Sequence, residues 1–305
     1  MTYYRTVPRK FLWIILLSAT VAACTNEAAE VVQQGYAKDV LVDAAWVATH
    51  MDDASVRLLE LGGNDEAFTE GHLPGASFLS MRQLSNPDDP IRGQIATEDQ
   101  MSAALAAVGV ARDQTIVLYD RRNNLFAARA YWALKYYQHA EVRIYNGGAG
   151  NWTEGGQALS TEVAEFELSS YQAGPADPEM RTTWQYVMDH TDDPSTLFCD
   201  VRGPDEHLGR DVRAARGGHI PGSINVEWTA AVDSDGTFKS FQELSALYAG
   251  AGFTADKQIV TYCQSGTRGA HTWFVLSELL GYPSVRNYDG SWAEYGNNAE
   301  SRIEG

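Results

Sequence analysis

A short loop in the second half of the chain carries the residues best suited to chemistry. Between a β-rich apolar run, Ile259 to Tyr262, and a helical stretch that begins at Gly269 lie Cys263, Gln264, Ser265, Gly266, Thr267 and Arg268. A strand-to-helix turn of this kind directs backbone N–H groups inward and adds the positive end of the helix dipole, so it favours anions. An isolated Cys is more often a buried core residue. Here Gly266 permits close backbone approach and Arg268 adds a positive charge, so we expect Cys263 to be a reactive thiolate.

Two reactions suit a thiolate in such a loop, namely attack on phosphorus and transfer of sulfur. Phosphatases of the cysteine type have the pattern C-x5-R, whose ring is wide enough for a tetrahedral phosphate. Only four residues separate Cys263 from Arg268. The tighter ring suits the terminal sulfur of a persulfide, which is a single atom that accepts several N–H hydrogen bonds. The count therefore favours sulfur transfer and leaves a cysteine phosphatase as the alternative.

The composition limits the partners of the chain. Its 305 residues are enough for two domains with a core each, and 44% of them are hydrophobic, as in folded proteins. The formal net charge of −17 disfavours nucleic acid, whose phosphates it would repel. An anionic substrate would need local arginines to offset the same field. Arg210, Arg213 and Arg216 are candidates for that role, although a solvated basic loop is the simpler interpretation.

The N-terminus has the pattern of an exported protein. Arg5, Arg9 and Lys10 precede an apolar run, Phe11 to Ala19, that is too short to span a membrane as a helix. The small residues before Cys24 resemble a bacterial lipobox, in which the Cys is lipidated. We therefore predict a lipoprotein signal peptide over residues 1–23, a lipid on Cys24 that anchors the chain to a membrane, and a tether over residues 24–38. The predicted location is the periplasmic side of the cell envelope, at the outer membrane in a Gram-negative host. The alternatives are an ordinary secretory signal with a chance Cys and an uncleaved anchor.

The rest of the chain contains an internal sequence repeat, and equivalent positions of the two copies are about 140 residues apart. Segments of the first copy recur in the second in the same order: Trp46 as Trp184, Arg57–Leu61 as Leu197–Val201, His72–Ala76 as His219–Ser223, Ile116–Asp120 as Ile259–Cys263, and Tyr145–Gly148 as Tyr288–Ser291. This order indicates a tandem duplication. We predict one domain over residues 39–159, a polar linker over 160–178 and a second domain over 179–305.

Each copy alternates short strands with helices. β-rich runs bounded by Gly, Asn or Asp alternate with helical stretches such as Thr97 to Val108 and Gly269 to Leu280. This alternation predicts an α/β fold, in which each of the two domains is a mainly parallel sheet with helices on both faces.

Taken together, these motifs resemble those of the tandem-domain rhodaneses, that is, the thiosulfate and 3-mercaptopyruvate sulfurtransferases. The resemblance runs from about Asp39 to Asn297. It is carried by Cys263 to Arg268 with the following His271-Thr272-Trp273-Phe274, by Asp289-Gly290-Ser291-Trp292, and by the two His-x-Pro-Gly segments. It implies two rhodanese-like α/β domains, an active loop in the second domain, and sulfur transfer that needs no metal and no organic cofactor.

The first copy lacks the nucleophile. Asp120 stands where Cys263 stands in the second copy, and a carboxylate cannot form a persulfide. The resemblance points the same way, because tandem rhodaneses commonly keep an inactive first domain. Its role is either to form one wall of the active-site cleft or only to stabilise the second domain.

The expected reaction is ping-pong covalent catalysis. The Cys263 thiolate takes the outer sulfur of a small anionic donor, and the loop N–H groups hold the resulting persulfide with the hydroxyls of Ser265 and Thr267. A thiol, or cyanide in vitro, then removes the sulfur. Cys199 interrupts an apolar run and is expected to be a buried structural thiol. Two other classes stay open: a non-enzymatic sulfur-binding module, and a redox protein that uses Cys199 with Cys263.

The donor is predicted from charge. By resemblance, a mercaptopyruvate enzyme would have Gly directly after the Cys and Arg four positions after Arg202, but this chain has Gln264 and Glu206 there. Glu206 would repel a carboxylate, whereas Arg268 can bind a sulfonate-like dianion, so thiosulfate is favoured over 3-mercaptopyruvate. Arg202 follows a strand end, and it either binds substrate or braces the loop.

Overall fold

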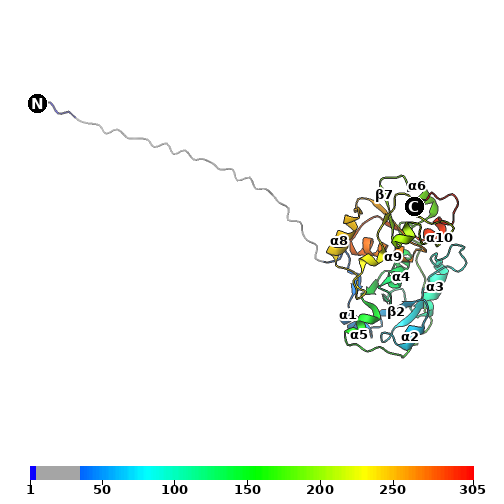
Figure 1. Cartoon of the computed structure of the whole chain (residues 1–305). Coiled ribbons are helices and arrows are strands. Elements are labelled where there is room, and N and C mark those ends of the chain that lie inside the picture. The colour runs from blue at the N-terminus through cyan, green and yellow to red at the C-terminus, as the bar shows by residue number, and fades with distance from the viewer. Residues whose placement is uncertain (5–34) are drawn as a thin grey trace. The chain divides into compact units, whose positions relative to one another are not determined.

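The computed structural model describes residues 1–4 and 35–305 of the chain, and Figure 1 draws its helices and strands. Cys24 and most of the predicted signal peptide lie outside these described residues. Within them, no helix is both long enough and apolar enough to cross a membrane. Both copies of the repeat lie in one compact unit.

The first copy folds around a five-stranded sheet in which all neighbouring strands run parallel, in the spatial order β1-β5-β4-β2-β3. Its strands are β1 (Leu41–Val42), β2 (Val56–Gly62), β3 (Ser77–Ser80), β4 (Thr115–Tyr119) and β5 (Val142–Tyr145). Its helices are α1 (Ala44–His50), α2 (Glu66–Glu70), α3 (Glu98–Ala107), α4 (Leu125–Tyr136) and α5 (Gly148–Glu154). The central strand, β4, ends directly before Asp120.

The second copy repeats this topology, with the parallel order β6-β10-β9-β7-β8. Its strands are β6 (Arg181–Thr182), β7 (Thr196–Asp200), β8 (Ile224–Asn225), β9 (Gln258–Tyr262) and β10 (Val285–Tyr288). Its helices are α6 (Trp184–His190), α7 (Pro204–His207), the 3-10 helix η1 (Trp228–Ala231), α8 (Phe241–Gly250), α9 (Thr267–Phe274), the π-helix η2 (Val275–Leu279) and α10 (Ser291–Tyr295). Its central strand, β9, ends directly before Cys263.

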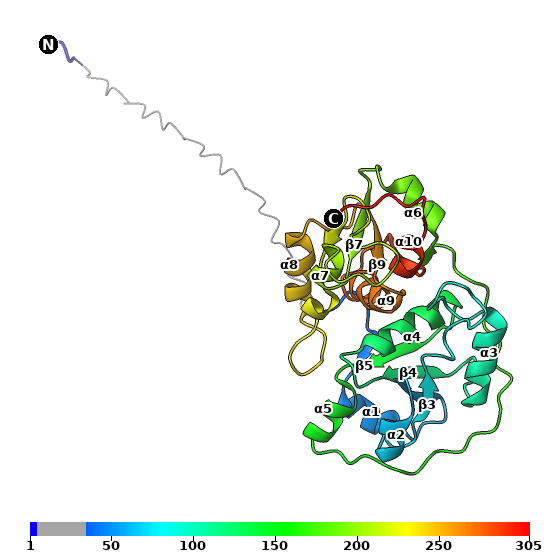
Figure 2. The ribbon, with the colours of Figure 1, turned by 45° about the vertical axis from the view of Figure 1, so that its right-hand side comes forward.

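Each sheet is covered on both faces, which confirms the predicted α/β architecture. Successive strand residues point to opposite faces, so Ile116 and Leu118 of β4 belong to one apolar cluster and Val117 to another. The cluster that holds Ile116 extends without interruption into the second copy, where it includes Ile259 of β9. Figure 2 shows the reason: α4 and α9 pack side by side between the two sheets. The two copies therefore share one core.

The predicted helices form where their sequences support them. Thr97 caps α3 with a capping box, since its hydroxyl accepts the N–H of Gln100 while the Gln100 side chain accepts the N–H of Thr97. The stretch predicted as one helix from Gly269 to Leu280 is instead α9 followed by the π turn η2, and Gly281 then adopts a left-handed conformation with φ of 74°.

Both segments that flank the first copy are attached to the core. The predicted linker has no helix or strand between Glu162 and Asp177, yet Tyr171 is buried there and its hydroxyl lies 3.0 Å from Nδ1 of His139. The last residues of the predicted tether contact the second copy, because Ala37 donates its N–H to the Leu279 carbonyl and Lys38 pairs with Glu278 at 2.7 Å.

Candidate active site

The sheet places the Cys263 loop at its carboxyl edge. Cys263 directly follows the central strand β9 and is only 1% exposed. Gly266 is the N-cap of α9 and has φ of 77°, a conformation that L side chains rarely adopt. A Cβ at this position would also lie 2.5 Å from the Asp289 carboxylate. Glycine is therefore required here for both its backbone conformation and its lack of a side chain.

Ser291, which was not predicted to be a site residue, fixes the loop by accepting two of its backbone N–H groups. The N–H groups of Cys263 and Gly266 donate to Oγ of Ser291 at 3.1 and 3.0 Å, and this hydroxyl donates to the Tyr288 carbonyl at 2.7 Å. Ser291 opens α10, and the next N–H group, that of Trp292, donates to the Cys263 carbonyl at 2.9 Å. The motif Asp289-Gly290-Ser291-Trp292 was the only sequence signal that pointed to Ser291. The hydrogen bonds of Ser291 could not be predicted from it, because they depend on the fold.

Other N–H groups of the loop stay available for an anion. Those of Gln264, Ser265, Thr267 and Arg268 donate to no acceptor in the part of the chain that the structure describes. All four residues are partly exposed. Together with the N-terminus of α9, they provide the positive surroundings that a thiolate or a persulfide anion needs.

The first copy has the corresponding loop, but in this loop the anion is a side chain of the protein, the carboxylate of Asp120. The Asp120 carboxylate accepts the N–H groups of Arg122, Asn124, Phe126 and Ala127 at 2.6 to 3.1 Å. Burial raises the pKa of Asp120, although these hydrogen bonds oppose the shift. The N–H groups of Arg122 and Asn124, which the repeat matches to those of Ser265 and Thr267, are thus occupied by a side chain of the protein itself.

Arg268 does not face the loop as a free cation. It forms a bidentate ion pair with Glu206 of α7 at 2.7 and 2.9 Å, and Arg213 lies 3.5 Å from the same carboxylate. Burial alone would lower the pKa of Arg268, but the hydrogen bonds and charge of Glu206, with the charge of Cys263, raise it. The predicted repulsion of a carboxylate by Glu206 and the predicted attraction of a dianion by Arg268 therefore largely cancel each other.

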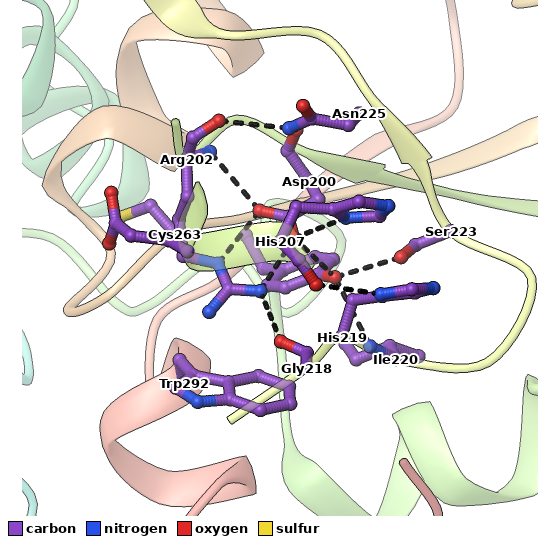
Figure 3. A network of polar contacts seen from close by, with 12 residues as sticks. Asp200, Arg202, His207, Gly218, His219, Ile220, Ser223, Asn225, Cys263 and Trp292 are labelled. Carbon is purple, nitrogen blue, oxygen red and sulfur yellow. Dashed lines mark hydrogen bonds and ion pairs between the residues drawn. The ribbon is translucent and has the colours of Figure 1, made fainter. Parts of the chain in front are cut away.

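Arg202 has the geometry of a brace. Figure 3 shows its guanidinium turned onto Asp200, with Nε and Nη2 donating to the two carboxylate oxygens at 2.9 and 2.6 Å. The same Nη2 donates to the Gly218 carbonyl, and the guanidinium carbon lies 4.4 Å from the Trp292 ring centroid. Arg202 is 1% exposed. Of the two roles expected for it, these contacts favour the support of the loop.

Asp200 collects the polar contacts beneath the active loop. Besides Arg202, it accepts hydrogen bonds from the Tyr262 hydroxyl at 3.0 Å and from Nδ1 of His207 at 2.9 Å. Burial raises the pKa of Asp200, but the hydrogen bonds from Arg202 and His207 outweigh it and lower the pKa to about 2. This charged carboxylate ties β7 to β9 and α7.

The remaining candidate residues are placed as follows. Cys199 is fully buried in β7, and burial raises the pKa of its thiol. Neither Cys199 nor Cys263 is in a disulfide. Arg210 pairs with Asp205, and Arg216 donates to the Ser301 carbonyl. In the described part of the chain, no cluster of three or more His, Cys, Asp or Glu side chains could hold a metal ion.

A pocket of about 450 Å³ opens beside the loop, and both copies contribute to it. Its lining comprises Pro90, Arg92, Arg213, Gln264, Ser265, Ala293 and Asn297. Pro90 and Arg92 belong to the first copy, 173 and 171 positions before Cys263, and nothing in the sequence singled them out. The first copy thus forms part of the wall of this pocket, as one of the two expected roles required.

Comparison with known proteins identifies the family. Residues 43–155 and 183–298 each match the rhodanese-like domain. The chain is 40% identical over 275 residues to the "Sulfur carrier protein TtuD" of Thermus thermophilus, covering 86% of this chain and 96% of that protein. It is 39% identical over 274 residues to a "Putative thiosulfate sulfurtransferase" of Mycobacterium tuberculosis, covering 87% of this chain and 98% of that protein.

Solved structures agree with this relationship. The anaerobic ergothioneine biosynthesis enzyme from Chlorobium limicola, in complex with trimethyl histidine, superimposes with a TM-score of 0.79 and 26% identity, covering 87% of this chain and 69% of that one. A structure of EanB with a cysteine persulfide and ergothioneine has a TM-score of 0.79 and 25% identity, covering 87% and 70% of the two chains. With two matched domains and relatives of this similarity, the chain belongs to the rhodanese family of sulfurtransferases.

Proposed function

We propose that the chain is a thiosulfate sulfurtransferase whose nucleophile is Cys263. The observation that carries the proposal is the contrast between the two loops. The second-copy loop has a thiol at its start and N–H groups with no protein acceptor, whereas Asp120 fills the corresponding loop of the first copy. A loop with a nucleophile and a vacant anion site can hold a sulfur atom, and a loop filled by a carboxylate cannot.

The reaction then has two steps. In the first, the Cys263 thiolate attacks the outer sulfur of thiosulfate, a new S–S bond forms, and the old S–S bond breaks with its electron pair leaving on sulfite. Sulfite leaves with its two negative charges, and the transferred sulfur carries one negative charge as the terminal atom of the Cys263 persulfide, where the loop N–H groups stabilise it. In the second step, cyanide or a thiolate attacks the terminal sulfur and releases the Cys263 thiolate. Ser265 and Thr267 are proposed to add hydroxyl donors to the persulfide.

The names of the relatives support the two substrates. The mycobacterial relatives carry the name of a thiosulfate enzyme, which favours thiosulfate as the donor. The Thermus relative is called a sulfur carrier protein, which favours a thiol or another sulfur-accepting group as the natural acceptor. We also propose export and lipid attachment at Cys24, on the N-terminal pattern alone.

A second donor is favoured by one specific contact. Because Arg268 pairs with Glu206, this carboxylate no longer excludes a donor that is itself a carboxylate. 3-Mercaptopyruvate therefore remains the alternative donor for the same Cys263 chemistry. A cysteine phosphatase is less favoured, because the loop keeps four residues between Cys263 and Arg268.

The proposal is tested by reading intact mass after incubation with each donor. The full chain and Cys263→Ser are treated separately with thiosulfate and with 3-mercaptopyruvate, and then with cyanide. The proposal expects the mass of one sulfur atom on the parent chain only, with its later release as thiocyanate, and a faster gain from thiosulfate. No gain from either donor would reject sulfur transfer, and a faster gain from 3-mercaptopyruvate would reassign the donor.

A further inference from the structure

A segment of the first copy reaches over the active loop of the second. A Cβ at Gly93 would lie 2.8 Å from the Ser265 carbonyl oxygen, so this segment is in direct contact with the loop. It is fixed there by two contacts to a buried ion pair. Arg129 donates to the Gly93 carbonyl at 3.0 Å, the N–H of Ile95 donates to Asp289 at 2.8 Å, and Arg129 pairs with Asp289 at 2.7 Å. The position of residue 92 relative to the loop is therefore well defined.

A segment of the second copy makes the equivalent contact with the inert loop of the first copy. A Cβ at Gly236 would lie 3.0 Å from the Asn123 side chain of the inert loop. The N–H of Phe238 donates to the Asn146 side chain at 3.0 Å, just as that of Ile95 donates to Asp289. Each copy thus places a loop over the strand-to-helix turn of the other copy.

The duplication makes these two loops directly comparable. Asp120 and Cys263 are 143 positions apart (263 − 120), and the same offset relates Asn146 to Asp289, Gly93 to Gly236 and Ile95 to Phe238. It therefore also relates Arg92 to Asp235. The residue carried over the Cys263 loop is a cation, whereas the residue carried over the inert loop is an anion.

Arg92 is the cation of the pocket that has no carboxylate partner. Arg213 is occupied by Asp211, at 2.9 Å from its Nε, and lies near Glu206. Arg92 is exposed, and no ion pair or hydrogen bond of its guanidinium occurs within the described residues. The lining of the pocket contains no Asp or Glu. In a chain of net charge −17, this pocket is a place where an anion meets an unneutralised arginine.

We infer that Arg92, supplied by the inert copy, is a donor-binding residue for the Cys263 site. Its guanidinium binds the oxygens of the anionic part of the donor, such as the sulfonate group of thiosulfate, so that the outer sulfur faces the loop. This inference rests on the proposed function and deepens it. It also gives the first copy a direct task in substrate binding, while its own loop stays inert.

Thiosulfate binding to a chain that cannot react tests this assignment. Calorimetry on full-length Cys263→Ser is compared with the same chain carrying Arg92→Gln, Arg92→Lys or Arg82→Gln. Arg82 is an exposed first-copy arginine outside the pocket, so Arg82→Gln removes the same charge as a matched control. We expect about tenfold weaker binding for Arg92→Gln, an intermediate loss for Arg92→Lys and no change for Arg82→Gln.

The possible outcomes separate this inference from the proposed function. Binding by Arg92→Gln that equals that of Cys263→Ser alone would overturn the assignment of Arg92, and so would equal weakening by Arg82→Gln. Absence of any thiosulfate binding to Cys263→Ser would overturn it as well. Arg92-dependent binding, combined with a parent chain that gains no sulfur from thiosulfate, would leave the anion site in place and reject the transfer reaction.

In the chain that keeps Cys263, the assignment of Arg92 predicts a change in KM for thiosulfate without a matching change in the rate of sulfur discharge. With Arg92→Gln, KM for thiosulfate rises while the rate of cyanide discharge from a preloaded persulfide stays within twofold of the parent, roughly, because Arg92 acts on the donor. A fall in the discharge rate as large as the rise in KM would instead indicate a structural role for Arg92.

Discussion

At the scale of single residues, the active loop depends on groups that carry no reactivity of their own. Ser291 accepts two N–H groups of the loop, and Gly266 fits only because it has no Cβ. These contacts use two N–H groups of the loop and leave those of Gln264, Ser265, Thr267 and Arg268 without an acceptor in the described part of the chain. The reactivity that we propose for Cys263 would thus depend on the placement of backbone groups as well as on nearby charges.

Ser291→Ala tests this support. The substitution leaves two buried N–H groups without an acceptor, at a cost of roughly 1–3 kcal/mol each, and it frees the loop to move. We expect slower formation of the persulfide, by about tenfold or more, together with a lower Tm. Ser55→Ala is the control, because Ser55 is an exposed turn residue whose hydroxyl bonds only to Asp53. A Ser291→Ala chain that loads sulfur at the parent rate would contradict the role of Ser291.

The residues of the loop could be predicted from sequence, whereas their partners could not. Cys263, Gly266 and Arg268 are neighbours in the chain, and a strand-to-helix turn is a local pattern. The pairing of Arg268 with Glu206 joins residues 62 positions apart, and Arg92 comes from the other copy. Such contacts depend on how the two sheets pack, which no local spacing reveals. For this reason the charge argument for the donor changed once the structure was known.

At the scale of secondary-structure elements, charged groups join the ends of the central strands to their neighbours. Asp200, at the end of β7, binds β9 through Tyr262 and α7 through His207. The mainly parallel sheets with helices on both faces followed from the alternation of strands and helices in the sequence, whereas the order of the strands came from the structure. The π turn after α9 did not, since the apolar periodicity continues through it.

The low pKa of Asp200 has a consequence for acid stability. A carboxylate with a folded pKa of about 2, below its ordinary 3.8, stabilises the fold fully above about pH 4, and this contribution is lost as the pH falls through 2. The shift corresponds to about 2 kcal/mol. We therefore expect Asp200→Asn to be destabilised most at pH 6, with the difference from the parent shrinking between pH 4 and 2. Urea unfolding at several pH values measures it, and a difference independent of pH would contradict the assignment.

The inert loop is expected to be structural. Asp120→Ala leaves four N–H groups, two in the turn before α4 and two in its first turn, without their acceptor, so the free energy of unfolding should fall by roughly 2–4 kcal/mol. The folded fraction should still load Cys263 with one sulfur, because Asp120 takes no part in the transfer. Asp113→Ala, at an exposed position, serves as the control for unfolding. Equal stability of the two variants would show that the carboxylate does not hold the turn.

At the scale of the whole molecule, we propose different roles for the two copies of the repeat. The shared core and the Arg129–Asp289 ion pair fix one copy against the other, so each can place a loop over the other's turn. One turn keeps a thiol and receives Arg92, while the other holds Asp120 and receives Asp235. The repeat was evident from the sequence, but the crossing of these loops required the structure.

The N-terminal pattern makes a prediction at the same scale. If Cys24 is lipidated, the full chain expressed in a bacterial host should incorporate labelled palmitate and sediment with membranes. Cys24→Ser should lose the label and remain in the supernatant, while Thr25→Ser should behave as the parent chain does. Sedimentation of a parent chain that carries no label would contradict lipid attachment and favour an uncleaved anchor.

We propose that Cys263, and no other group, carries the sulfur. The most direct measurement is peptide mapping by mass spectrometry after brief treatment of the folded chain with thiosulfate and alkylation of exposed persulfides. The account predicts one added sulfur per chain, located on the peptide that contains Cys263, with the buried Cys199 unmodified. Sulfur on Cys199, sulfur spread over both cysteines, or a disulfide between them would contradict it.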